Sequence, residues 1–275
     1  DEDSSAKEKC LKMFRNECGA CVRATEASLQ GVVELIAIPH FDDHLALVLQ
    51  YCGPVMLSKV VRQDSEALAA LDLKEVSTAD KTDIMGQVLN AVLGLNSIGV
   101  GHNDVNPPNI MVERKWTANN ASSYLRVTLI DLGTATVLED DGTSELPLTG
   151  SREYTDPQVT FERLAKENDI ESPGKGRINP FHNDMFAVGI IGTKLFPDLG
   201  YFEMDGGLGQ AAGNTPTAQD LVRLLEDSVD LKWKNRPTAA SVRSSQFFER
   251  WQRESSFLQG VGVPARGAQA KASPP

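Results

Sequence analysis

The chain has 275 residues, 41% of them hydrophobic, and a formal net charge of −11 at pH 7. This length suffices for one large domain or for two small lobes that share a cleft. The negative charge argues against a general nucleic-acid binder and against a polybasic membrane patch, although a local basic site stays compatible with it.

We expect neither a membrane-spanning helix nor a signal peptide in this sequence. No stretch approaches the ~20 apolar residues of a membrane-spanning helix, and the acidic N-terminus does not resemble a signal peptide. Cys18 and Cys21 form a C-x-x-C that could be redox-active or half of a zinc site. Because no second pair completes such a site, buried thiols in a reducing compartment are the favoured interpretation. We expect an intracellular protein, cytoplasmic or nuclear.

The first fifty residues predict a polar end, a helix and a hairpin. Residues 1–9 are polar and are expected to fray. Apolar residues within 10–29 recur at spacings that suit a helix, although KCLKMF (9–14) could instead be a short strand. The β-rich runs GVVELIAI and HLALVLQYC, joined by PHFDD, predict a hairpin. Gly-Pro at 53–54 then breaks the chain.

The middle of the chain predicts a buried helix, a polar loop and two strands. Apolar residues recur with a 3.6-residue period over 80–98, and Gly99 closes this helix. Pro107 and Pro108 exclude a helix through VGHNDVNPPN, and the apolar run at 110–112 predicts a buried strand. A polar insertion (113–124) and a second strand, LRVTLI, follow, and DLGTA ends that strand.

The last part predicts helices separated by irregular segments. Residues 134–158 are loop-like, DMFAVGIIGTKLF reads as a central buried helix, and 197–216 are Gly-rich and irregular. TAQDLVRLLEDSV predicts an amphipathic helix with Thr217 as its N-cap. NRPTAASVRSSQFFERW predicts a turn and a last helix, and the tail 255–275 is expected to be disordered.

Asp104, Asn109 and Asp131 form the set that suggests chemistry. Two strands running side by side would bring Asn109 and Asp131 together, and their oxygens are ligands suited to Mg²⁺. Asp104 could accept the proton of an attacking hydroxyl, so the set suits phosphoryl transfer. Taken singly, each residue has an ordinary interpretation: Asp104 could cap a turn, Asn109 could satisfy loop backbone and Asp131 could end a strand.

Five segments, in order, resemble the protein kinase superfamily. HNDVNPPN stands where that family has H-R-D-L-x-x-x-N, and DLG stands where it has D-F-G. GSREYTDPQ resembles the end of the activation segment, NDMFAVGIIGTKLF the buried helix that opens with Asp, and KNRPTAASV the late R-P-T element. The variants, including an LQG before the hairpin, look most like divergent fungal kinase-like proteins.

The resemblance implies an α+β, bilobal protein kinase-like fold. Residues 1–52 would form a reduced N-terminal β lobe and 53–254 a larger helical C-terminal lobe. ATP and Mg²⁺ would be the cofactors, with Asp104 as catalytic base and Asn109 and Asp131 as metal ligands.

The same resemblance implies supporting residues. His102 would pack in the catalytic loop, Ser151 would contact that loop through its hydroxyl, and Asp184 would hold its backbone. A buried Asp184 must accept backbone N–H bonds to be tolerated. Leu49 would gate the back of the nucleotide pocket, and Gln50 to Cys52 would form the hinge.

The front lobe departs from the family pattern. No G-x-G-x-x-G precedes the hairpin, so two strands and the phosphate-covering loop are expected to be missing. The lack of an initiator Met is compatible with a fragment, and a glycine-rich strand upstream would restore the ATP site. Lys12 resembles the ATP-contacting Lys, with Glu17 or Glu26 as its helix partner. Equally, these could be surface residues of one helix.

Four substitutions affect the expected chemistry. Asn106 replaces a Lys near the base, which should weaken stabilisation of developing charge. Asn103 replaces the Arg of H-R-D, so activation should not depend on loop phosphorylation. Gln158 replaces a Glu that pairs with Arg236, and that buried ion pair is expected to be lost. Leu132 replaces a Phe and should be tolerated.

Three functions therefore compete. Asp104, Asn109 and Asp131 favour an active Ser/Thr-type kinase, and the short front lobe favours a catalytically impaired pseudokinase that acts as a binding or scaffold module. Asn106 favours a small-molecule phosphotransferase, which segments 150–158 and 184–196 disfavour. We expect a protein substrate or protein partner, with no nucleic acid and no membrane; the sequence does not indicate an oligomeric state.

Overall fold

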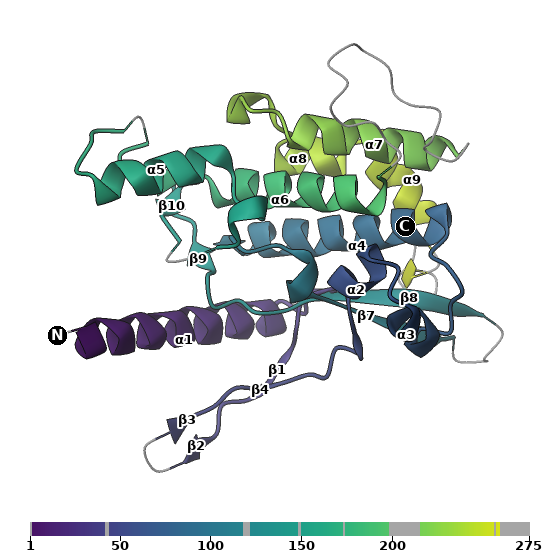
Figure 1. Ribbon diagram of the computed structural model, residues 1–275, viewed down its shortest axis with the longest axis horizontal. Helices are drawn as coiled ribbons and strands as arrows, with labels where there is room; N and C mark the ends of the chain where they lie inside the picture. Colours follow the sequence, from purple (N-terminus) through teal and green to yellow (C-terminus); the bar gives the residue numbers. More distant parts are fainter. Residues whose placement is uncertain are drawn as a thin grey trace, which may run out of the picture.

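A long helix and a projecting hairpin open the structure (Figure 1). The computed structural model describes residues 2–41, 44–117, 122–147, 150–172, 174–197, 215–255 and 257–258. The first elements are α1 (Glu2–Glu26), β1 (Leu35–Ala37), β2 (His40–Phe41), β3 (His44–Leu45) and β4 (Val48–Leu49).

The predicted helix and hairpin are confirmed, with two corrections. β1 pairs antiparallel with β4 and β2 with β3. Residues 2–9 are helical rather than frayed, because Lys and Glu are good helix formers whatever their polarity. The alternative of a strand at 9–14 is wrong, since these residues lie inside α1.

The hairpin exposes apolar side chains to an unusual degree. Ile36 is 63% exposed and Tyr51, just after β4, is 73% exposed, and Ile38 and Val48 are exposed as well. In Figure 1 the hairpin extends away from the helical body. A two-stranded hairpin gains little stability by itself in water.

The buried helix predicted over 80–98 is α4 (Thr78–Ser97). Ser77 and Asp80 form a capping box at its start, and Gly99 just beyond its end has φ +70°, as the sequence predicts. Between the hairpin and α4 lie elements that the sequence did not predict: β5 (Val55–Met56), α2 (Leu57–Val61) and α3 (Ser65–Ala70).

Within the polar insertion expected at 113–124, residues 113–116 and 123–124 are strand. β7 (Ile110–Trp116) pairs antiparallel with β8 (Ser123–Leu129) in one continuous register, and β5 joins the other edge of β7. Glu113 faces Arg126 across the two strands and forms an ion pair with it. This cross-strand pair makes a polar sequence compatible with a half-buried strand.

The second half of the chain is mainly helical. The segment predicted as loop-like contains only short elements until α5, which begins at Pro157 and was not predicted. The elements are β6 (Val100–Gly101), β9 (Thr136–Val137), β10 (Ser144–Glu145), α5 (Pro157–Glu167), β11 (Arg177–Ile178), α6 (Pro180–Leu195), α7 (Pro216–Ser228), α8 (Ala239–Arg243) and α9 (Gln246–Glu254). β6 pairs with β9 and β10 with β11.

The end of the chain agrees with one prediction and departs from two. The buried helix at α6 is confirmed. The N-cap of α7 is Thr215 rather than Thr217, whose hydroxyl bonds Glu254 instead. The start of the tail is packed: Phe257 is buried, and its ring forms a T-shaped pair with that of Tyr124. Residues 198–214 and 259–275 lie outside the described residues.

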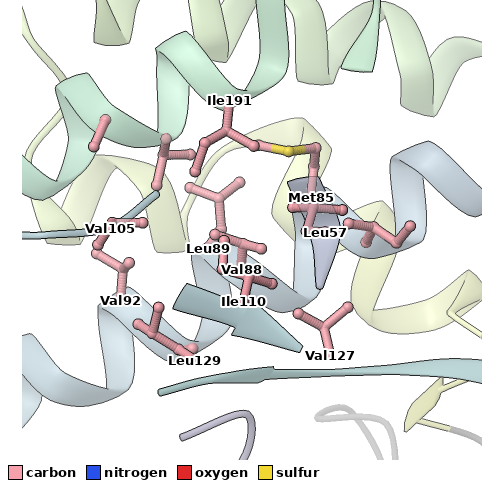
Figure 2. Packing of buried hydrophobic residues seen from close by; sticks show 14 of the residues in the cluster. Leu57, Met85, Val88, Leu89, Val92, Val105, Ile110, Val127, Leu129 and Ile191 are labelled. Carbon is pink, nitrogen blue, oxygen red and sulfur yellow. The ribbon is translucent and has the colours of Figure 1, made fainter. Parts of the chain in front are cut away.

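The core lies around α4. Figure 2 shows Met85, Val88, Leu89 and Val92 of this helix packed between strand residues and Ile191 of α6. The strand side is formed by Ile110, Val127 and Leu129, all essentially inaccessible to solvent. α4 is thus covered by β7 and β8 on one side and by α6 on the other (Figure 1), and the mixed α+β class is confirmed. Within the described residues, no helix combines the length and apolar character needed to cross a membrane.

Candidate active site

The loop between β6 and β7 is held by its own side chains. Pro107 and Pro108 open a single 3-10 turn, and the Asn106 side chain caps it by accepting the N–H of Asn109 at 3.1 Å. Proline suits this first turn because it lacks an N–H and fixes φ. The turn delivers Asn109 to the start of β7.

Asp104 lies at the centre of a hydrogen-bond network. Its Oδ1 accepts the backbone N–H of Ser151 at 2.8 Å, and its Oδ2 accepts the Asn109 amide at 3.1 Å. The Asn106 amide donates to the Ser151 hydroxyl at 3.0 Å and to the Asp104 carbonyl at 3.1 Å. The structure therefore brings Asp104, Asn106, Asn109 and Ser151 together, as the sequence predicts.

Asp131 follows the strand next to Asn109. Ile110 pairs with Leu129, and the N–H of Ile130 donates to the Asn109 carbonyl at 2.9 Å. Asp131 has φ +63°, and its Oδ1 accepts the N–H of Gly133. The two strands thus place Asn109 and Asp131 side by side, with Asp131 exposed to solvent and Leu132 fully buried behind it.

Asp184, at the start of α6, holds the loop from below. Its two carboxylate oxygens accept the N–H groups of His102 and Asn103 at 2.8 and 2.7 Å. Burial raises the pKa of Asp184 to about 7, although these two hydrogen bonds act in the opposite direction. The sequence expectation that this carboxylate is buried and accepts backbone N–H bonds is confirmed.

His102 is fully buried beside this carboxylate. Burial lowers its pKa, which favours the neutral imidazole. Nδ1 lies 3.2 Å from the N–H of Asp104, so Nε2 carries the proton and donates to the Ile130 carbonyl at 3.1 Å. His102 therefore connects the loop to the strand that leads to Asp131, which is a packing role.

Asp184 gives a prediction for stability against pH. Its folded pKa lies above its unfolded value, so between about pH 4 and 7 the unfolded state has lost a proton that the folded state retains. This carboxyl should make the wild-type free energy of unfolding fall, relative to that of Asp184→Asn, as pH rises across the window. Urea unfolding at several pH values should show this slope, and Asp184→Asn, though less stable throughout, should lack it. An unchanged slope in the variant would contradict the assignment.

The structure does not bring Lys12 to Glu17. Both lie on α1, and the Lys12 ammonium is 3.6 Å from Glu145. Burial raises the pKa of Glu17, and the charge of Asp131 adds to the rise, so Glu17 lies near Asp131. Within the described residues no cation forms an ion pair with Glu17, and Glu26, the other proposed partner, is exposed. The interpretation of Lys12 as a strand Lys paired with the helix is therefore wrong.

The residues expected at the hinge follow β4. Leu49 is partly buried against the core, and the N–H of Gln50 donates to the Glu34 carbonyl at 2.9 Å. The Cys52 thiol is buried and donates to the Gln50 carbonyl. These contacts fix the chain path between the hairpin and β5. The role of Leu49, Gln50 and Cys52 in nucleotide binding stays a prediction.

Arg236 retains a buried ion pair, contrary to expectation. Its guanidinium forms a two-armed contact with Asp156, one arm at 3.1 Å, and both side chains are almost inaccessible. The N–H of Asp156 in turn donates to Asn183 at 3.0 Å. The carboxylate lost at Gln158 is thus replaced by one two residues earlier. The sequence analysis did not predict the roles of Asp156 and Asn183. An Asp two residues before Gln158 could have indicated that the acidic partner of Arg236 had moved.

The donor set can be compared with what Mg²⁺ requires. In the described part of the chain, no three His, Cys, Asp or Glu side chains gather into a metal cage. Mg²⁺ uses one or two carboxylates together with phosphates and water rather than such a cage. Both amide hydrogen bonds of Asn109 go to Asp104, which leaves the Asn109 amide oxygen for another partner. Asn109 and Asp131 therefore fit a magnesium–phosphate complex.

The C-x-x-C pair does not resemble a redox site. Cys21 is buried, and burial raises its pKa to about 12. Burial also raises the pKa of Cys18. A reactive dithiol needs a lowered thiol pKa, so these thiols are better explained as packing groups of α1.

Comparison with known proteins points to one family. The sequence profile described as "protein kinase domain" matches residues 2–248. The chain is 30% identical to calcium-dependent protein kinase 27 of Arabidopsis thaliana over 145 residues, 52% of this chain and 27% of that protein. It is 31% identical to serine/threonine-protein kinase pkn3 of Myxococcus xanthus over 133 residues, 46% of this chain and 21% of that protein.

A mammalian protein is similar too. The interferon-induced, double-stranded RNA-activated protein kinase of Mus musculus is 27% identical over 132 residues, 47% of this chain and 22% of that protein. In each case the match spans about a quarter of the relative's length. The likeness to fungal kinase-like proteins stays a prediction.

Proposed function

Because this chain belongs to the protein kinase family, we propose that it transfers a phosphoryl group from ATP to a Ser or Thr hydroxyl of a protein substrate. The observation that carries the proposal is the meeting of Asp104, Asn109 and Asp131 at the ends of β7 and β8. Their chemistry is that of a base next to two oxygen donors for a metal–phosphate complex.

In this proposal Asp104 accepts the proton of the attacking hydroxyl. Ser151 and Asn109 each donate to a different oxygen of its carboxylate, so the carboxylate cannot rotate freely. Bound magnesium would neutralise charge on the phosphates, and Asn109 and Asp131 would hold it. A base fixed within hydrogen-bond reach of the hydroxyl supports general base catalysis.

Asn106 sets an expected limit on the rate. Its amide nitrogen donates to Ser151 and to the Asp104 carbonyl, so it organises the loop and brings no positive charge. A Lys at this position would also stabilise charge on the transferred phosphate. Loss of a single electrostatic group at a transition state costs about 10²–10³ in rate, so we expect slow transfer.

A catalytically impaired binding module is the second candidate, and one observation favours it. Glu17 lies near Asp131, yet among the described residues it has no cation within ion-pair distance, and Lys12 is engaged by Glu145. If no other Lys contacts the ATP phosphates, nucleotide affinity or transfer should be low. The small-molecule phosphotransferase has no comparable support.

Thermal unfolding with and without nucleotide tests the proposal. A ligand at one hundred times its dissociation constant stabilises the folded state by about 2.7 kcal/mol, so millimolar ATP with Mg²⁺ should raise the melting temperature. ATP with EDTA is the control and should act less. No shift would favour the binding module. A peptide array assayed beside choline and aminoglycosides then distinguishes protein from small-molecule substrates.

Transfer should not require a phosphorylated activation segment. Asn103 is buried, and its amide donates to the Thr136 hydroxyl at 2.8 Å and to the Thr134 carbonyl at 3.3 Å. These neutral hydrogen bonds hold the segment at the position where the Arg of H-R-D would bind a phosphate group. Phosphatase treatment should leave the transfer rate unchanged, whereas Asn103→Ala should lower it. A rate that falls with dephosphorylation would contradict this.

A further inference from the structure

A groove lies between α1 and the strand β9. β9 passes beside α1 (Figure 1), and the cavity between them has a volume of about 460 Å³. One wall is a stripe of α1 formed by Lys12, Arg15, Asn16, Gly19, Ala20 and Arg23. Val100 and Ala135 form a buried apolar floor, and Val137 on the other wall is 51% exposed. The groove has charged rims and an apolar interior.

Gly19 is the feature that indicates an occupant. Glycine inside a helix is less favourable than alanine, so a helical glycine usually has a packing reason. In α4 and α6, an added Cβ at Gly86, Gly189 or Gly192 would lie within 2.6 Å of a neighbouring side chain. At Gly19 nothing lies within 4 Å. The fold itself does not require this glycine, whereas a chain approaching α1 closely would.

The charges of the groove indicate what that chain carries. Lys12 is paired with Glu145 across the groove, and Glu139, the other acidic residue of its lining, is paired with Arg177. Arg15 and Arg23 are exposed, and among the described residues no carboxylate lies within ion-pair distance of either. Two arginines without carboxylate partners are notable in a chain of net charge −11. They favour an anionic occupant, since guanidinium groups bind carboxylates in two-armed fashion.

The spacing of the two arginines fits an extended peptide. Arg15 and Arg23 are eight residues apart on a helix, or about 12 Å along its axis. Four residues of an extended strand cover about 13 Å, and side chains four apart point to the same face. We propose that this groove binds an extended segment of a partner protein with two carboxylates four residues apart and small or apolar residues between them.

This site does not depend on phosphoryl transfer, so it can be tested by binding alone. The probe is a pool of labelled nine-residue peptides with two fixed glutamates four residues apart and Ala, Val, Leu or Thr elsewhere. A matched pool carries glutamine at the two fixed positions. At an ionic strength of about 0.05 M the glutamate pool should bind at least about tenfold more tightly. Equal binding of both pools would overturn the proposal.

Two variants test where the peptide binds. Arg15→Glu combined with Arg23→Glu should weaken binding at least about tenfold. The control, Lys59→Glu with Lys166→Glu, makes the same charge change at exposed positions on α2 and α5 and should bind like the wild type. An equal loss of peptide binding in both variants would show nonspecific electrostatic attraction and would overturn the assignment.

Gly19→Leu tests the groove without changing its charge. The empty space above Gly19 lets the variant fold, and its helix propensity should keep the melting temperature equal to or above that of the wild type. Binding should nevertheless be lost, because the leucine occupies the groove. Unchanged peptide binding in a folded Gly19→Leu variant would overturn the proposal. It would also be overturned if the groove bound a second copy of this chain instead of the peptide.

Discussion

Replacing Asp156 by Ala should lower the free energy of unfolding by about 3–5 kcal/mol, because it leaves the Arg236 charge buried without a partner. The Arg236 side chain is wholly buried and Asp156 is 4% exposed. Among the described residues, the other direct contacts of Arg236 are the Asp230 and His182 carbonyls and the ring of Phe186. The Asp230 carboxylate interacts with Arg236 electrostatically but forms no ion pair with it there. Urea unfolding followed by circular dichroism would measure the loss.

Asp64→Ala is the matched control for this change. Both aspartates cap a helix: Asp156 accepts the N–H of Gln158 at 2.8 Å, and Asp64 accepts that of Ala67 at 2.9 Å. Among the described residues, Asp64 forms this capping hydrogen bond but no ion pair. Losing a cap alone costs about 1 kcal/mol. If both variants lost the same amount, the ion pair would contribute nothing beyond the cap.

A relocated carboxylate should restore part of the loss. Adding Gln158→Glu to Asp156→Ala places an acid where related kinases carry one, two residues further along α5. If Arg236 needs a negative partner in this pocket rather than Asp156 in particular, the double variant should be more stable than Asp156→Ala. Equal instability of the two would show that the Asp156 geometry is indispensable.

Replacing Asp131 by Asn should abolish metal-dependent transfer, lowering it by at least about 10³, the upper range for a single transition-state group. The fold should tolerate the change. Asn adopts the left-handed conformation that Asp131 has at φ +63°, and its amide oxygen can still accept the N–H of Gly133. The variant loses only the negative charge that we propose faces the metal. The measurement is transfer of labelled phosphate to a protein substrate.

Asp140→Asn provides the control, since Asp140 is an exposed carboxylate in the same segment. It should leave transfer unchanged. Transfer that survived Asp131→Asn would make the assignment of Asp131 as metal ligand wrong. The melting-temperature shift caused by ATP with Mg²⁺ gives a second readout, which Asp131→Asn should reduce and Asp140→Asn should not.

The parts of the fold that the sequence predicts share one physical property. α4 and α6 carry long, regular apolar patterns, and the loop around Asp104 is bounded by prolines and an apolar strand, so local residues decide these structures. Asp104, Asn109 and Asp131 could be grouped because pairing of adjacent strands is the usual outcome of such an order.

α5 could not be predicted, because its packing depends on a buried charge. Glu162 is 1% exposed, and its carboxylate accepts the N–H groups of Gly174 and Gly176 and the Ser172 hydroxyl. In an apolar pattern, a glutamate predicts a surface position. Its burial here is tolerated only because the distant loop supplies these hydrogen-bond donors. The interpretation of Lys12 was wrong for a similar reason, because its ion-pair partner, Glu145, is remote in sequence.

The hairpin formed by β1 and β4 has a practical consequence for work with this chain in solution. Its exposed Ile36, Ile38, Val48 and Tyr51 lie beside strand edges whose backbone groups can pair with another chain. Concentrated samples should therefore scatter light and elute early from a sizing column, as molecules adhere edge to edge. Because this exposed surface is apolar rather than charged, adding a kosmotropic salt such as sulfate should increase the aggregation.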